Sequence, residues 1–402
     1  MTPAAARLPF DRDDPLLARV AWSRLAEPGD ARAARLVETV GPSEALRAVV
    51  ERGGRLANCP AHGPADGHHV GSWMARYLPR LSVLDPARDL AAVRRLGGRV
   101  LAPGDGEWPA GLQDLAVPPI CLWVVGPASL ATLRDRSVAL VGARAATTYG
   151  EHVARDLGYG LAERGFAVVS GLAYGIDAAS HRGALAAAGT SVAVVAGGLD
   201  RTYPRGNEAL MRKLAADGAV VSEVPPGSTP SRSRFLQRNR LIAAIAGGTV
   251  VVEAAWRSGS LSTARAAAAL GRPVAAVPGP TTSMTSAGCH ALIRSGAAVL
   301  VTDAAEVAEL VGRLGDDLAP ERPRRRTVRD ELDTVTQQVL DALPVRSGRP
   351  LGALCRTAGL DEPTVRSALG RLQLRELAER HGDGWRLRPR STSAAAGPAG
   401  AG

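Results

Sequence analysis

The sequence predicts an α/β protein whose main domain is a doubly wound, mostly parallel sheet, flanked by a small helical domain and a winged helix. Between residues 90 and 313, short valine-rich runs alternate with helical stretches. These runs are continuously apolar instead of alternating with polar residues, which indicates strands that are buried on both faces. The segments on either side show apolar residues at helical three- and four-residue spacing instead.

Composition favours a nucleic-acid partner. The 402-residue chain carries a net charge of +10. Residues 91–314 hold 22 basic and 16 acidic groups, and so contribute most of this excess positive charge. Such a balance favours a polyanion, and the central domain is the first place to look for its binding site. The four cysteines are scattered singly along the chain. The first residues, MTPAAARLPFDRDD, lack the apolar core flanked by a basic region that a signal peptide has. We therefore expect a cytoplasmic protein that does not insert into a membrane.

Residues 12–83 predict a small helical domain. Its helical stretches are LLARVAWSRL, ARAARLVETV, PSEALRAVVERG and GSWMARYLPRL. The loop CPAHGPADGHH brings Cys59, His62, His68 and His69 close in sequence. Their spacing does not match a known zinc pattern, so we expect a solvated loop and no metal.

Eight runs predict the strands of the central domain. They read CLWVVG, SVALVGA, AVVSGL, SVAVVAGG, AVVSEV, TVVVEAA, PVAAVPG and AAVLVT. In sheets of this kind the ligand site lies beyond the carboxyl ends of the strands. The loops that follow these runs are therefore the candidate binding elements.

The first such loop lies in VALVGARAATTYG, where Gly142 permits a tight turn before a helix that begins near Thr148. The unpaired N–H groups of a helix start bind phosphate, and the guanidinium of Arg144 could close on the same group. Thr147 could cap the helix or donate another hydrogen bond. Neither a dinucleotide fingerprint nor a P-loop is present. The alternative is a structural turn with a surface arginine.

The second loop, SGLAYGIDAASHRGAL, contains a possible acid–base pair. Gly171 and Gly175 would let the backbone bend beneath a ligand. We expect Asp177 to cap the following helix, and His181, four residues later, to steady that cap. Because no third group stands at a suggestive position, no catalytic dyad is expected.

The stretch PSRSRFLQRNRLIAAIA is the most specific, because arginines surround an aromatic residue. Its candidate binding residues are Arg232, Arg234, Phe235, Arg238, Asn239 and Arg240. Arginines that follow a phosphate backbone beside an aromatic ring that stacks on a base are typical of single-strand binding. The alternative is a basic helix start with Phe235 as a buried anchor.

A further loop follows TVVVEAAWR. Ser258, Gly259 and Ser260 stand at the start of the next helix and could donate to phosphate. Glu253, at the end of the strand, could act as a base or simply order the loop.

After a charged, proline-rich linker at 314–328, residues 329–390 predict three helices and a hairpin that turns at Gly382, which together resemble a winged helix-turn-helix. Arg366, Arg371 and Arg375 of the third helix could contact duplex DNA, but Asp361 and Glu362 would then face its phosphates. Residues 391–402 are of low complexity and are expected to be disordered.

Taken in order, these motifs resemble the DNA-processing protein A (DprA, also Smf) family. The resemblance covers residues 90–311 and rests on VGARAATTYG, VVSGLAYGIDAASHRGAL, GLDRTYPRGN, VSEVPPG, FLQRNRLIA, VVVEAAWRSGSLSTARAAAALGRPVAAVPG and GCHALIRSGA. It implies an extended Rossmann-like fold between a sterile-alpha-motif-like domain and the winged helix. A departure is Tyr174, where relatives often have a basic residue, and it could supply stacking instead of charge.

The resemblance also implies a function. Such a protein binds single-stranded DNA, protects DNA taken up in natural transformation and loads the RecA recombinase onto it, with neither a cofactor nor turnover. Arg144, Arg232 and Phe235 would form the strand-binding pocket, and the residues that would help them are Gly142, Thr147, Arg238, Asn239 and Arg240. The family works as a homodimer, which places the segment from Cys289 to Val299, with His290 and Leu292, at the interface.

Two other functions stay open at this stage. One is a nucleoside-monophosphate glycosidase like the cytokinin-activating hydrolases, whose P-G-G-x-G-T-x-x-E signature is only partly matched by AGGTVVVEAA. The other is a duplex-DNA regulator that acts through the winged helix.

Overall fold

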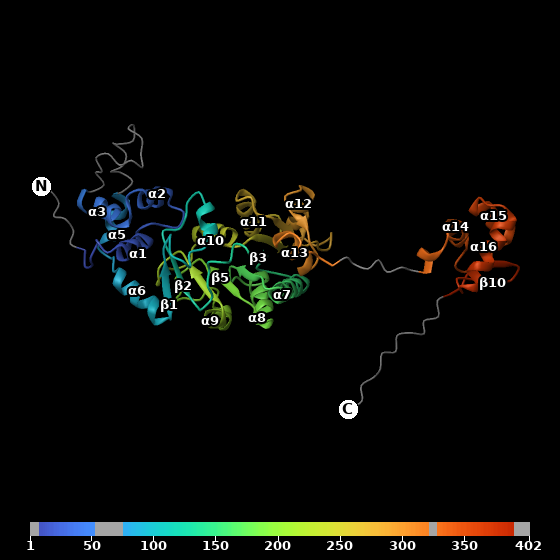
Figure 1. Cartoon of the computed structure of the whole chain (residues 1–402), viewed down its shortest axis with the longest axis horizontal. Helices are drawn as coiled ribbons and strands as arrows, with labels where there is room; N and C mark the ends of the chain where they lie inside the picture. Colours follow the sequence, from blue (N-terminus) through green and yellow to red (C-terminus); the bar gives the residue numbers. More distant parts are fainter. Residues whose placement is uncertain (1–7, 53–74, 321–327, 390–402) are drawn as a thin grey trace, which may run out of the picture. The chain divides into compact units, whose positions relative to one another are not determined.

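The computed structural model describes residues 8–52, 75–320 and 328–389, which fall into two compact units, residues 1–320 and 321–402 (Figure 1). Each unit is described by itself.

The first unit is built on a sheet with nine strands among the described residues, in the order β1-β2-β6-β5-β4-β3-β7-β8-β9. The strands are β1(Gly98–Leu101), β2(Leu122–Val125), β3(Ser137–Gly142), β4(Ala167–Ser170), β5(Ser191–Val195), β6(Ala219–Ser222), β7(Gly248–Glu253), β8(Val274–Ala276) and β9(Val299–Leu300). The seven strands from β6 to β9 pair in parallel, whereas β1 and β2 are antiparallel. This confirms the predicted fold class, and β1 is an addition to the predicted strands.

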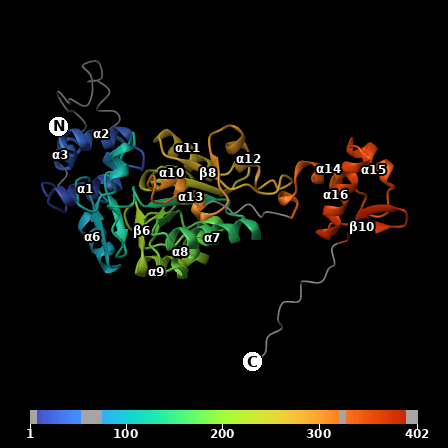
Figure 2. The same ribbon diagram turned by 45° about the vertical axis from the view of Figure 1, so that its right-hand side comes forward.

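Helices cover both faces of this sheet. They are α7(Thr148–Glu163), α8(Ile176–Ala186), α9(Glu208–Asp217), α10(Arg232–Ile245), α11(Ser260–Ala269), α12(Ala287–Arg294) and α13(Ala304–Val311), with short 3-10 turns η2(Ala110–Asp114) and η3(Arg205–Asn207). Along β3, Ala139 and Val141 join the core under α10 and α11, while Val138 and Leu140 join the core with α7. Burial on both faces explains why the strands are continuously apolar. Figure 2 shows α10 and α11 on the opposite side of the sheet from α7 and α8.

The N-terminal helices form their own core and also pack on the sheet. They are α1(Pro15–Leu25), α2(Ala31–Val40), α3(Pro42–Arg52), η1(Ala75–Tyr77), α5(Leu78–Leu81) and α6(Pro86–Arg95). Trp22 meets Tyr77 edge to face at 5.5 Å inside that core. Val20 of α1 and Leu90 of α6 lie in one cluster with Trp123 of β2. The helices and the sheet thus form one compact unit, and a domain boundary near residues 83–90 remains a prediction.

The strand order contains a reversal that marks a ligand site. From β3 the chain proceeds through β4, β5 and β6 in one direction, whereas β7, β8 and β9 continue from the other side of β3. Loops after β3 and β7 therefore diverge and leave a crevice at the carboxyl ends of these two strands.

The second unit contains η4(Val328–Glu331), α14(Thr334–Ala342), α15(Leu351–Ala358) and α16(Glu362–Leu374), followed by a hairpin of β10(Ala378–His381) and β11(Gly384–Leu387). Asp333 and Asp361 cap α14 and α16 with their side chains. Gly382 has φ +59° in the hairpin turn, a conformation that favours glycine. These elements agree with the predicted winged helix.

Candidate nucleic-acid interface

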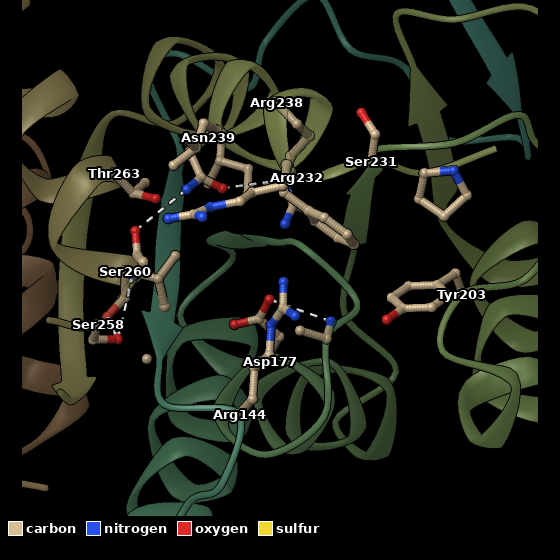
Figure 3. Close-up of a pocket in the computed structure, with 18 residues that line it drawn as sticks. Arg144, Asp177, Tyr203, Ser231, Arg232, Arg238, Asn239, Ser258, Ser260 and Thr263 are labelled. Atoms are coloured by element: carbon tan, nitrogen blue, oxygen red, sulfur yellow. Dashed lines mark hydrogen bonds between the residues drawn. The ribbon is translucent and has the colours of Figure 1, made fainter. Parts of the chain in front are cut away.

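A cleft of about 490 Å³ lies over the carboxyl ends of β3, β4, β5 and β7 (Figure 3). It brings together nine of the predicted binding residues from three separate segments, the loop after β3, helix α10 and the start of α11: Gly142, Arg144, Arg232, Phe235, Arg238, Asn239, Ser258, Gly259 and Ser260. Thr147, Gly171, Gly175 and Arg240 do not line it. The segments that follow the strands therefore meet at one rim, largely as the sequence predicts.

The loop after β3 is fixed from below by Glu253, the last residue of β7. Its carboxylate accepts hydrogen bonds from Thr147 N (2.9 Å), Thr147 Oγ1 (2.8 Å) and Thr285 Oγ1 (2.7 Å). Thr147 in turn caps α7, because its Oγ1 accepts from Gly150 N. Glu253 is 2% exposed and does not line the cleft, so of its two predicted roles the structure supports loop ordering.

The centre of the cleft is a stack of side chains. The Arg144 guanidinium lies over the Phe235 ring, 4.6 Å from its centroid, and the Tyr203 ring lies 5.6 Å from the same ring. Among the described residues Arg144 makes no ion pair. Phe235 is half-buried at the cleft wall. It is therefore neither a fully buried anchor nor a fully exposed ring.

Tyr203 also lines the cleft and is 51% exposed, but it is not among the binding residues predicted from the sequence. It follows β5 in GLDRTYP, where a cis peptide bond joins it to Pro204. An aromatic residue in a polar strand-end loop was the signal that could have identified it. Tyr174 is also exposed, but its hydroxyl accepts from Gly206 N (3.3 Å) and the residue does not line the cleft.

Arg238 forms the cleft floor and does not project freely. It is 6% exposed, and its guanidinium donates to the carbonyls of Gly171 (2.8 Å) and Val194. Burial lowers the pKa of Arg238 to about 10, while the nearby carboxylate of Asp177 acts in the opposite direction. A Cβ at Gly171 would fall 2.2 Å from the guanidinium, so this glycine makes room for the arginine.

The Asp177–His181 pairing is a wrong prediction. The helix α8 begins at Ile176 and is preceded by Gly175 (φ +70°), while Asp177 lies inside the first turn and accepts from Ala173 N at 3.3 Å. Desolvation raises the pKa of Asp177. His181 Nδ1 lies 2.8 Å from Ser191 Oγ at the start of β5, and burial lowers the pKa of this imidazole to about 3. Both are parts of the scaffold.

The remaining arginines of α10 divide by direction. Arg232 is exposed and lines the cleft. Arg234 forms a bidentate ion pair with Glu27 of the N-terminal helices (2.9 and 3.1 Å). Arg240 points away, pairs with Glu223 at 2.5 Å and donates to Val117 O. The structure therefore removes Arg240 from the predicted binding set, because its charge is already neutralised in a buried pair.

The loop after β7 contributes the wall next to α10. Ser258 Oγ and Ser260 Oγ are 2.7 Å apart at the start of α11, and Asn239 Nδ2 donates to Ser262 Oγ (2.8 Å) in the first turn of the same helix. Figure 3 shows Asn239 and Arg232 on one wall of the cleft and the two serines beside them. Hydroxyls and backbone N–H groups at this helix start can donate to phosphate.

The predicted dimer residues are split between core and surface. Cys289 is fully buried with its Sγ 3.5 Å from Val251 O, and burial raises the pKa of its thiol to about 12. Its side chain is thus excluded from any surface. Leu292 packs against the core, and His290 Nε2 lies 3.0 Å from Gly279 O. Val299 is 52% exposed on β9, an edge strand of the sheet.

Two further predictions concern metal and membrane. The candidate ligands Cys59, His62, His68 and His69 lie outside the described residues. Within the described ranges, no three His, Cys, Asp or Glu residues group in a way that could hold a metal ion. Nor does any helix in those ranges have the length and apolarity that crossing a membrane requires.

Comparisons with known proteins agree on one family. Residues 99–312 match the model of DNA recombination-mediator protein A. A putative DNA processing protein DprA of Mycobacterium tuberculosis is 46% identical over 381 residues, which cover 91% of this chain and 94% of that protein. The Smf protein of Escherichia coli is 43% identical over 211 residues, covering 52% of this chain and 56% of that protein. The crystal structure of DprA from Streptococcus pneumoniae covers 76% of this chain and 99% of that chain, with 29% identity and a TM-score of 0.60.

Proposed function

The chain belongs to the DNA recombination-mediator protein A family, and from that premise we propose that it binds single-stranded DNA in the cleft of Arg144 and Phe235 and presents it to the RecA recombinase. The observation that carries the proposal is the stack of the Arg144 guanidinium on the Phe235 ring at the centre of the cleft. A guanidinium without an ion pair among the described residues is available to phosphate, and an aromatic ring is available to a base.

Binding exchanges one set of contacts for another. When a strand enters, Arg144 leaves the Phe235 ring for a phosphate, and a base takes its place beside Phe235 and Tyr203. Arg232 at the exposed start of α10 contacts a neighbouring phosphate. Because stacking on a ring accepts every base, the affinity depends little on sequence and strongly on salt.

The assembly is part of the same proposal. β9 ends the sheet and exposes Val299 (52%) and Leu300 (48%), and an exposed apolar edge strand is a template for pairing with a second chain. We therefore propose a homodimer through the region of α12 and β9, with Val299 at the contact and Cys289 behind it in the core.

The alternative functions find less support. A glycosidase would need a base that faces its substrate, but the carboxylate of Glu253 is buried beneath the cleft and holds two threonines. A duplex-DNA regulator would need free cations on α16, but the guanidinium of Arg366 pairs with Glu362, and that of Arg371 lies 3.9 Å from Asp333. We propose binding without turnover.

The test is a salt-resolved comparison of single-stranded and duplex DNA with the wild-type protein and Arg144→Ala. The variant should bind all single strands more weakly, and the slope of log affinity against log salt should fall by about 0.7, the value for one single-strand phosphate contact. Arg155→Ala, at an exposed position of α7 outside the cleft, is the charge-matched control. Absence of wild-type binding at low salt, or a slope of zero, would contradict the proposal.

A further inference from the structure

A second cleft, of about 450 Å³, lies on the same edge of the sheet as the first. The loop after β5 supplies Tyr203 to the first cleft and Arg201 to the second. The segment after β6 likewise supplies Ser231 to the first and Gly227 to the second. These two loops therefore form a wall common to both clefts, and the far side of the second cleft is helix α6 of the N-terminal helices.

The second cleft offers two cations that have no partner among the described residues. Arg88 and Arg95 of α6 line it and are exposed. Neither side chain makes an ion pair or a hydrogen bond with any part of the chain that the structure describes. Arg201 also lines the cleft, and it forms a long ion pair (3.8 Å) with its neighbour Asp200.

The carboxylates that line the cleft are already engaged. Asp89 is 7% exposed and accepts from Arg24 Nε (2.7 Å) and Nη2 (2.6 Å). Asp200 Oδ1 accepts from Gly227 N (2.7 Å), and Asp85 accepts from the backbone of Arg88 as the cap of α6. The charge of Asp89 is therefore balanced by Arg24, while Asp85 and Asp200 are held by backbone N–H groups beside the exposed guanidinium groups of Arg88 and Arg95.

Arg24 also fixes the geometry of this cleft. Besides its bidentate pair with Asp89 of α6, its Nη2 donates to Pro226 O (2.8 Å) in the segment after β6. One side chain of α1 thus ties α6 to the wall that the two clefts share. Arg88 and Arg95 are consequently held over the second cleft in a fixed relation to the first.

The stability of the fold does not explain Arg88. It lies in the first turn of α6, where the helix dipole disfavours a cation, whereas Arg95 lies in the favourable last turn. Two apolar side chains, Val83 (68% exposed) and Leu96 (41% exposed), also line this cleft. Cations beside exposed apolar surface suit a ligand that has both phosphates and bases.

We infer that the second cleft is a further phosphate-binding station for the same DNA strand, which runs from Arg144 and Phe235 across the loops after β5 and β6 to Arg88 and Arg95. This inference rests on the proposed function of the first cleft. It gives the N-terminal helices a direct part in binding, in addition to their packing against the sheet.

The test uses the full-length chain and oligothymidylates from about 4 to about 16 nucleotides, the usual range of single-strand site sizes. The double variant Arg88→Ala/Arg95→Ala should bind the shortest strands as the wild type does. On the longest strands its salt slope should be smaller by about 1.4, the value for two lost phosphate contacts. The affinity of the double variant should also reach its plateau at a shorter oligothymidylate length than that of the wild type.

The control is Arg94→Ala/Arg212→Ala, which removes two exposed arginines that line neither cleft. It should keep the wild-type slope, and thermal melting should show that all variants fold. If Arg88→Ala/Arg95→Ala keeps the wild-type slope, or if the control loses as much, the second station is wrong while the first stands. If the wild type binds no strand of any length, the proposed function fails and this inference fails with it.

Discussion

At the scale of single residues, the cleft separates arginines that are available to a ligand from arginines that build the protein. Arg144 and Arg232 are available, whereas Arg238 and Arg240 are held by carbonyl oxygens or by a carboxylate. All four residues are arginines, and three of them, Arg232, Arg238 and Arg240, lie in helix α10. The difference lies in the direction that each position on α10 faces, which side-chain type alone does not fix.

His181 gives a prediction at this scale, because its imidazole is fully buried and its pKa is lowered to about 3. The unfolded chain takes up a proton near pH 6.5, while the folded chain does so only near pH 3, so stability falls as the pH falls through this window. The stability of the wild type relative to His181→Gln should decrease by up to about 1.4 kcal/mol per pH unit lowered. Denaturant titrations at several pH values measure it.

A difference between wild type and His181→Gln that stays constant from pH 6.5 down to the acid limit of folding would show that the imidazole is not buried in its neutral form.

At the scale of elements, the cleft depends on loops that are tied together beneath it. Glu253 at the end of β7 binds the loop after β3 through Thr147 and the segment before α12 through Thr285. Gly175 allows the loop after β4 to approach β3, because a Cβ there would lie 2.4 Å from Ala143 O. The walls are therefore positioned from below, and the side chains that line the cleft do not have to hold the loops together.

Glu253→Gln tests this arrangement. An amide has one acceptor oxygen where the carboxylate has two, so at least one buried donor would lose its partner, at a cost of about 1–3 kcal/mol in unfolding free energy. Single-strand affinity should fall as well, because the Thr147 loop carries Arg144. Glu309→Gln on exposed α13 is the matched control. Chemical denaturation and strand binding measure the two effects.

The same variant addresses the glycosidase alternative. Wild-type protein incubated with nucleoside monophosphates should release no free base, and Glu253→Gln should behave identically. Base release by the wild type that the variant abolishes would establish Glu253 as a catalytic base and overturn the proposed function.

At the scale of the whole molecule, the two compact units have separate cores. The core of the second unit includes Val339, Leu354, Val365 and Leu369, and no residue of the first unit belongs to this core. Both clefts are lined by residues of the first unit alone. The proposed binding surface is therefore complete without the winged helix.

A chain that ends at residue 320 should consequently bind single-stranded DNA within about twofold of the full-length affinity at physiological salt, a difference of about 0.4 kcal/mol. Electrophoretic mobility shift or fluorescence anisotropy measures it. A loss of tenfold or more would assign the winged helix a direct part in strand binding, and retention of duplex binding by residues 321–402 alone would revive the regulator hypothesis.

The sheet, the winged helix and the rim of loops can be predicted from the sequence, because they depend on local signals. Valine runs at residues 137–142 and 248–253, the glycine at 142 and the arginines around Phe235 are visible without coordinates. They suffice to place Arg144 directly after a strand and Phe235 near a helix start at the carboxyl edge of a doubly wound sheet, which is where such sheets bind ligands.

Which side chains are free depends on contacts between distant parts of the chain. The partners of His181 and Arg240 are Ser191 and Glu223, and the ring beside Phe235 is Tyr203 from the loop after β5. The position of α6 against that loop, which creates the second cleft, joins residues more than a hundred positions apart. Such contacts depend on how the helices pack across the sheet, and no local pattern of residues encodes them.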